Sequence, residues 1–133
     1  MPTAGPSDLA AVPLFASLSD SELADVAGWF EVKDVGAGVQ LAGEGTTGYS
    51  FFVIGEGGVA VSSGGVQLVE LGPGDFFGEV ALLGSHRRTA SVTTLQPSRI
   101  FVLFGNDFAR LRGGYPGVAA ELEATMRRRL DEP

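Results

Sequence analysis

Short runs of apolar and β-branched residues, separated by glycine-rich breaks, fill the middle of the chain. Runs of this length with turn residues between them predict strands. The expected strands cover residues 32–35, 39–41, 49–54, 59–62, 66–71, 90–95 and 100–104. Breaks such as Gly64-Gly65 and Gly72-Pro73-Gly74 supply the backbone angles that a chain reversal requires. The regular spacing indicates a barrel or roll.

Twenty glycines among 133 residues reinforce the prediction of many tight turns. A chain of this length forms one domain and buries roughly two-thirds of the surface that its unfolded form exposes. We expect a flexible tail over residues 1–7 and a single domain over residues 8–133. Within the domain, residues 8–30 are expected to be helical, 31–104 to form the roll and 105–131 to form C-terminal helices.

The first clear helix signal begins at Ser19. Ser19 and Glu22 form an S-x-x-E capping box, and Leu18 and Leu23 are spaced for a hydrophobic staple. A helix is therefore expected to start here, after a short helical turn within residues 7–15.

Two more helices are predicted after the last strand. Asn106 can cap a helix that stops at Gly113-Gly114, and Pro116 can begin another helix that runs to Leu130. We expect the final helix to bury one stripe and to expose its arginine run to water. The predicted stripe consists of Ala119, Leu122, Met126 and Leu130, and the predicted solvated face holds Arg127, Arg128 and Arg129.

Composition narrows the classes of function. The formal net charge of −7 argues against a surface that neutralises nucleic-acid phosphates. With no Cys and a single histidine, His86, the sequence lacks the residue pairs that most nucleophilic enzymes and zinc sites need. The longest apolar runs are far shorter than a membrane span. We therefore expect a cytoplasmic, non-catalytic protein with no metal site or cofactor and no nucleic-acid or membrane contact of its own.

One stretch has the pattern of an anion cradle: residues 77–83, FGEVALL, followed by Arg88-Thr89-Ala90. Ala and Leu favour a helical turn over residues 79–83, and the first amides of a helix attract anions. Arg88 can hold a phosphate through a two-point fork, and Thr89 adds a hydroxyl donor. Glu79 suits this site only if it accepts a hydrogen bond from a ligand hydroxyl and is neutralised by Arg88. A compact nucleotide with one phosphate fits these requirements.

This stretch resembles the phosphate-binding cassette of cyclic nucleotide-binding domains, F-G-E-x-A-L followed by R-[STA]-A. The glycine and strand pattern of residues 38–61 is also similar to that family, and the resemblance covers about residues 14–130. It implies a mainly β fold with flanking helices. The expected architecture is an eight-stranded antiparallel, jelly-roll-like β-roll with N-terminal helices, a short cassette helix and C-terminal lid helices.

The resemblance also implies a small-molecule ligand, cAMP, with cGMP as the alternative, and an effector domain or protein partner that receives the signal. The implied phosphate contacts are the backbone amides of Gly78, Val80 and Ala81 and the side chain of Arg88. The resemblance implies that Glu79 contacts the ribose 2′-hydroxyl and that Thr89 and Ala90 complete the wall of the phosphate site. It also implies that Val61 and Val69 line the pocket of the base.

Simpler interpretations stay open beside this one. The Gly78-Glu79 pair could be an ordinary helix start whose carboxylate matches the helix dipole and pairs with Arg88. Val61 and Val69 would lie in the core of any β protein. The whole domain could instead be a ligand-free scaffold or dimerisation module. Six phenylalanines are expected in the core: Phe51, Phe52, Phe76, Phe77, Phe101 and Phe104.

Overall fold

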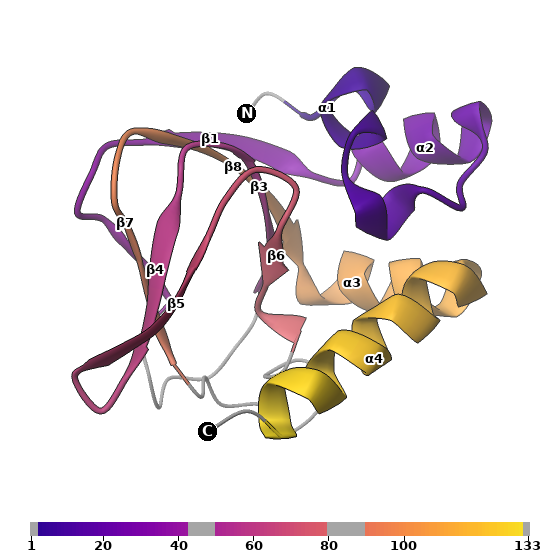
Figure 1. The fold of residues 1–133 in the computed structure, drawn as a ribbon. Coiled ribbons are helices and arrows are strands. Elements are labelled where there is room, and N and C mark those ends of the chain that lie inside the picture. Colours follow the sequence, from indigo (N-terminus) through magenta and orange to yellow (C-terminus); the bar gives the residue numbers. More distant parts are fainter. Residues whose placement is uncertain (1–2, 43–49, 80–89, 132–133) are drawn as a thin grey trace.

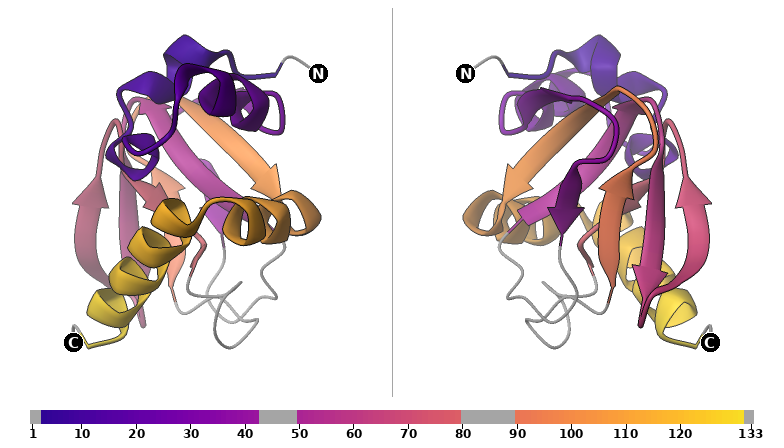
Figure 2. Two further views of the ribbon diagram at one scale, coloured as in Figure 1. Left: turned by 90° about the vertical axis from the view of Figure 1, so that its right-hand side faces the viewer. Right: turned by 90° about the vertical axis from the view of Figure 1, so that its left-hand side faces the viewer.

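The computed structural model describes residues 3–42, 50–79 and 90–131. Within these residues, eight strands form two four-stranded antiparallel sheets, with the helices gathered on one side of the roll (Figure 1 and Figure 2). The first sheet has the order β1 (Glu31–Val35), β8 (Ser98–Phe104), β3 (Ser50–Glu56), β6 (Phe76–Phe77). The second has the order β2 (Gln40–Ala42), β7 (Ser91–Thr94), β4 (Val59–Ser63), β5 (Val66–Leu71). The expected eight-stranded antiparallel roll is confirmed.

Helices flank the roll at both ends of the chain. They are α1 (Pro6–Ala10), the 3₁₀ helix η1 (Pro13–Phe15), α2 (Asp20–Ala27), α3 (Gly105–Gly114) and α4 (Pro116–Asp131). The capping box is present at α2, where the Glu22 amide donates to Ser19 Oγ at 3.2 Å and the Ser19 amide donates to Glu22 Oε1 at 2.9 Å. Pro116 begins α4 as predicted.

Alternation along the central strands gives the domain two apolar layers. Successive residues of a strand face opposite sides of the sheet, so Phe51 and Val53 pack with the helices, whereas Phe52 and Ile54 face the second sheet. The ring of Phe51 lies 5.0 Å from that of Phe108 on α3. The first sheet is therefore covered on both faces, and it provides a rigid base for the segments at its edges.

The N-terminus is more structured than the tail predicted for residues 1–7. Ala4 is buried, its amide donates to the Phe30 carbonyl at 3.1 Å, and α1 already begins at Pro6. Thr3 also forms an antiparallel bridge with Glu31 at the start of β1. Backbone hydrogen bonds to residues 30 and 31 hold this part of the chain in place. Such contacts between distant residues cannot be predicted from the local composition.

Phe104 and Asn106 differ from their predicted roles. The N-cap of α3 is Phe104, one residue before the helix starts at Gly105, and it makes no side-chain cap. Phe104 is 48% exposed, whereas the other five phenylalanines assigned to the core are buried. It is the last residue of β8 and lies opposite Ser50 at the end of the sheet, where fewer residues can cover it.

Candidate functional site

The candidate cassette starts where β6 leaves the first sheet. Phe77 lies opposite Phe52 in the ladder between β6 and β3, and the two rings stack with their centroids 4.6 Å apart. The next residue, Gly78, has φ 101°, a backbone conformation that favours glycine. The paired aromatic residues therefore fix the end of β6, and Gly78 lets the chain turn sharply away from the sheet.

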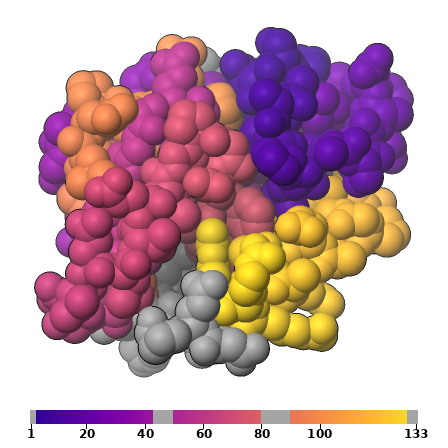
Figure 3. Space-filling model, in the orientation of Figure 1, coloured from indigo at the N-terminus to yellow at the C-terminus, as the bar shows by residue number. Residues whose placement is uncertain are grey.

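Glu79, directly after this turn, is completely buried. Arg129 on α4 reaches its carboxylate, with Nη1 donating to Glu79 Oε1. The other amino group of Arg129, Nη2, donates to the Phe76 carbonyl at 2.6 Å, and the guanidinium carbon lies 5.1 Å from the centre of the Phe76 ring. In Figure 3 the yellow atoms of α4 lie against the red atoms of the chain that precede residue 80. A buried carboxylate requires such a partner to stay ionised at acceptable cost.

The pairing of Arg129 with Glu79 corrects one prediction. The sequence interpretation placed Arg129 on a solvated helix face, but the side chain of Arg129 is only 28% exposed and pairs with Glu79. The predicted pairing of Glu79 with Arg88 stays a prediction, because Arg88 lies outside the described residues. Sequence reasoning therefore missed a site residue on the last turns of α4.

The buried stripe of α4 explains how Arg129 reaches the site. Val118, Leu122 and Thr125 are buried, whereas Ala119 and Met126 of the predicted stripe are only partly buried. Arg129 continues the observed stripe by one further helical step of four residues. The stripe is displaced from the predicted one by about one residue, and this displacement turns Arg129 inward.

The structure describes five of the nine predicted ligand contacts. Gly78 and Glu79 are adjacent at the end of β6, and Ala90 is half-buried immediately before β7 begins. Val61 and Val69 lie opposite each other on β4 and β5. Four predicted contacts, Val80, Ala81, Arg88 and Thr89, lie outside the described residues, as do His86 and nearly all of the predicted helical turn.

The two valines predicted for the base differ in burial. Val61 is partly buried and packs against the apolar layer between the sheets. Val69 is 48% exposed, so it is not the core residue that a plain β domain would place there. β5 is the outer strand of its sheet, and an exposed apolar side chain at this position is available for contact with a ligand.

The described part of the chain contains no group of three or more His, Cys, Asp or Glu side chains arranged to hold a metal ion. Among the same residues, no helix combines the length and apolar character required to cross a membrane. At the cassette, a carboxylate such as that of Glu79 can accept a hydrogen bond from a hydroxyl group.

Comparison with known proteins agrees with this geometry. The model of the cyclic nucleotide-binding domain family matches residues 32–115. A cyclic nucleotide-gated potassium channel of Rhizobium etli is 34% identical over 125 residues, 94% of this chain and 35% of the channel. A cAMP-dependent protein kinase regulatory subunit of Eremothecium gossypii is 40% identical over 106 residues, 79% of this chain and 23% of the subunit. The chain therefore spans about a third or less of these two relatives.

A solved structure shows the same architecture. The regulatory domain of Toxoplasma gondii PKA in complex with cAMP superimposes with a TM-score of 0.79 at 25% identity. The match covers 90% of this chain and 48% of that one. The family match extends over most of the roll and includes the whole candidate cassette. From the sequence match, the fold and the buried acidic residue at the start of the cassette, we conclude that this chain belongs to the cyclic nucleotide-binding domain family.

Proposed function

We propose that this chain is a non-catalytic regulatory module that binds cAMP and reports binding through movement of α4. The observation that carries the proposal is the buried carboxylate of Glu79 at the start of the cassette. An ionised carboxylate only accepts hydrogen bonds, so it suits a ribose 2′-hydroxyl and would repel a phosphate. Membership of the family supports a cyclic nucleotide as the ligand.

The remaining proposed contacts are to the cyclic phosphate and to the base of the nucleotide. The cyclic phosphate is held by the backbone amides of Gly78, Val80 and Ala81 and by Arg88, beside a wall of Thr89 and Ala90. The base lies against Val61 and Val69, of which Val69 is exposed enough to meet it. In this arrangement Arg129 neutralises Glu79, and the guanidinium of Arg88 binds the phosphate.

The preference for cAMP over cGMP rests on relatives. The similar kinase subunit is named as cAMP-dependent, and the similar Toxoplasma structure holds cAMP. We expect calorimetric titration of both nucleotides, side by side, to give a clearly lower Kd for cAMP. Equal affinities, or tighter binding of cGMP, would contradict this preference while leaving cyclic-nucleotide binding intact.

Signal transmission is proposed to run from Glu79 through Arg129 to α4. Because Arg129 contacts both the Glu79 carboxylate and the Phe76 carbonyl, the docking of α4 and the arrangement of the carboxylate depend on each other. A ligand that binds better to one arrangement of the Glu79 carboxylate therefore shifts the equilibrium between docked and undocked α4. We also propose that an effector domain or a partner protein receives this signal from α4. The protein is proposed to lie in the cytoplasm.

Hydrogen exchange tests this transmission directly. Saturating cAMP should slow the exchange of amides in the second half of α4, because ligand binding favours the docked helix. The same protection should shrink in Arg129→Gln and persist in Arg128→Gln, since the Arg128 guanidinium reaches Thr125 within its own helix. Unchanged exchange in the wild-type protein at full occupancy would contradict the proposed route.

Binding itself is tested by calorimetry with Arg88→Ala. Loss of a charge-assisted contact worth about 1.5 to 3 kcal/mol should weaken cAMP binding by about one to two decades without unfolding the protein. Arg99→Ala is the matched control, because Arg99 lies on β8 in an exposed ion pair with Asp34. Absence of any heat or melting shift with either nucleotide would reject the proposed function.

A further inference from the structure

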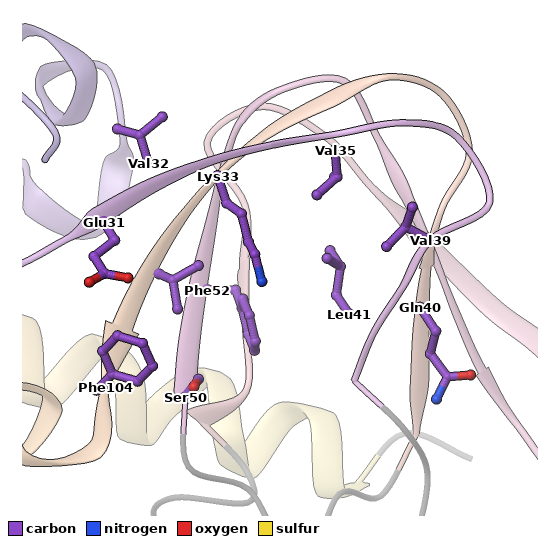
Figure 4. A pocket seen from close by; sticks show the side chains of 11 residues that line it. Glu31, Val32, Lys33, Val35, Val39, Gln40, Leu41, Ser50, Phe52 and Phe104 are labelled. Carbon is purple, nitrogen blue, oxygen red and sulfur yellow. The ribbon is translucent and has the colours of Figure 1, made fainter. Parts of the chain in front are cut away.

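A hollow lies at the edge of the roll where β1 and β2 are the outer strands of the two sheets. Its volume is about 390 Å³, within the range of small-molecule sites. We call it the open-edge pocket; the lining residues that matter for its chemistry are Glu31, Lys33, Val35, Leu41, Phe52 and Phe104. Figure 4 shows their side chains around one space. The pocket is separate from Glu79, which follows the outer strand at the other end of the first sheet.

The floor of the open-edge pocket is apolar. Phe52 is buried, and Val35 and Leu41 pack partly against the layer between the sheets. At the rim, Phe104 leaves 48% of its surface exposed. An apolar floor with an exposed aromatic rim favours a ligand that carries an apolar group of its own.

Two opposite charges line the same pocket from one strand. Glu31 and Lys33 are two residues apart on β1, so they face the same side of the sheet with their backbones about 6.5 Å apart. Throughout the described residues, neither side chain forms an ion pair with the other or with a third group. In Figure 4 the Lys33 chain extends toward Phe52, whereas the Glu31 carboxylate lies toward Phe104. Each charge is therefore available to a ligand.

From this pairing we propose that the open-edge pocket binds a small zwitterion with an apolar side chain, of the class of free hydrophobic α-amino acids. The ligand carboxylate binds the Lys33 ammonium, the ligand ammonium binds the Glu31 carboxylate, and the side chain lies on Phe52 and Leu41. A simple anion would be repelled by Glu31, and a simple cation would be repelled by Lys33. A zwitterion satisfies both charges at once, with a hydrogen bond of about 3 Å at each end.

The test uses L-phenylalanine and two analogues that each lack one charge. Amide NMR titrations, without nucleotide, should show L-phenylalanine binding about tenfold more tightly than phenylethylamine or phenylpropanoate, the low end for charge-assisted contacts. Lys33→Gln should weaken binding of L-phenylalanine to the level of phenylethylamine and leave the amine unaffected. Glu31→Gln should do the same relative to phenylpropanoate. Arg99→Gln, which breaks an exposed ion pair on the other side of the sheet, should leave all three affinities unchanged.

Three results would overturn the proposal. They are the absence of shift changes in the lining residues at millimolar L-phenylalanine, equal affinity for all three compounds, or a charge preference that survives Lys33→Gln and Glu31→Gln. If either variant is misfolded by its amide spectrum, Lys33→Met and Glu31→Ala provide the same comparison.

Discussion

The two edges of the roll differ in how their charged side chains are paired. At the edge that carries the cassette, Glu79 is fully buried and Arg129 crosses from α4 to pair with it. At the opposite edge, Glu31 and Lys33 face an open pocket, and neither forms an ion pair within the described residues. A buried charge is costly without a partner, whereas water solvates an exposed one. The cassette edge therefore links stability to helix docking, and the open edge keeps its charges free to meet a ligand.

This contrast suggests how the family fold can combine a switch with a rigid base. Substitutions at the cassette edge should change the free energy of unfolding and ligand affinity together. Substitutions of the charges at the open edge should leave the free energy of unfolding nearly unchanged.

The largest effect is expected at the aromatic residue shared by the two edges. Phe52 stacks on Phe77 beside the cassette and also lines the open-edge pocket. Phe52→Ala should lower the free energy of unfolding by about 3 to 5 kcal/mol, because it leaves a cavity between the sheets. Phe104→Ala, at an exposed rim position, should cost about 1 kcal/mol or less. Urea unfolding measures both, and equal losses would contradict the assigned packing.

The next effect concerns the ion pair of the cassette edge. Arg129→Gln should lower the free energy of unfolding by about 3 kcal/mol, the low end for a buried ion pair, since it removes the Arg129 guanidinium from the buried Glu79. The control, Arg112→Gln, removes an ion pair between α3 and α4 whose two side chains are each more than 40% exposed. It should cost about 1 kcal/mol or less. If urea unfolding gave similar losses for both variants, the buried ion pair of Glu79 and Arg129 would stabilise the fold no more than an exposed one.

Ligand stabilisation should be of comparable size. At a concentration of about 100 times its Kd, cAMP should raise the free energy of unfolding by about 2.7 kcal/mol. The same concentration should stabilise Arg88→Ala by only about 0.4 to 1.4 kcal/mol, as expected for an affinity one to two decades weaker. Denaturation with and without nucleotide provides the comparison. Equal stabilisation of the wild-type protein and Arg88→Ala would show that Arg88 does not contact the ligand.

The smallest effect is expected at the open edge. Lys33→Gln should change the free energy of unfolding by no more than about 0.5 kcal/mol, because Lys33 is exposed and forms no ion pair among the described residues. Urea unfolding under the same conditions as for Arg129→Gln measures it. A loss as large as that of Arg129→Gln would abolish the distinction between the two edges.

Local signals predicted most of the fold. The glycine-separated β-branched runs, the Ser19 and Glu22 capping box and Pro116 at a helix start each act within a few residues, so they can be read in order along the chain. β6 has only two residues, which is too short for any periodicity, and its existence depends on pairing with β3. The resemblance to the family supplied this eighth strand.

The candidate site was predictable in part. The cassette sequence predicted Glu79 as a binding residue, but Arg129, which pairs with it, lies 50 positions further along the chain. No local pattern joins Glu79 to Arg129, and a displacement of the buried α4 stripe by about one residue moves an arginine from water to the interior. The stripe of Val118, Leu122 and Thr125 carries the signal, because Arg129 is its next member.

The central claim is that the Glu79 carboxylate receives the ribose 2′-hydroxyl of a cyclic nucleotide. Calorimetric titration of cAMP and 2′-deoxy-cAMP into the wild-type protein and into Glu79→Ala tests it most directly. The account predicts that the wild-type protein binds cAMP about tenfold or more tightly than the deoxy ligand, and that Glu79→Ala loses this preference. Equal wild-type affinities, or a preference that persists in Glu79→Ala, would contradict it.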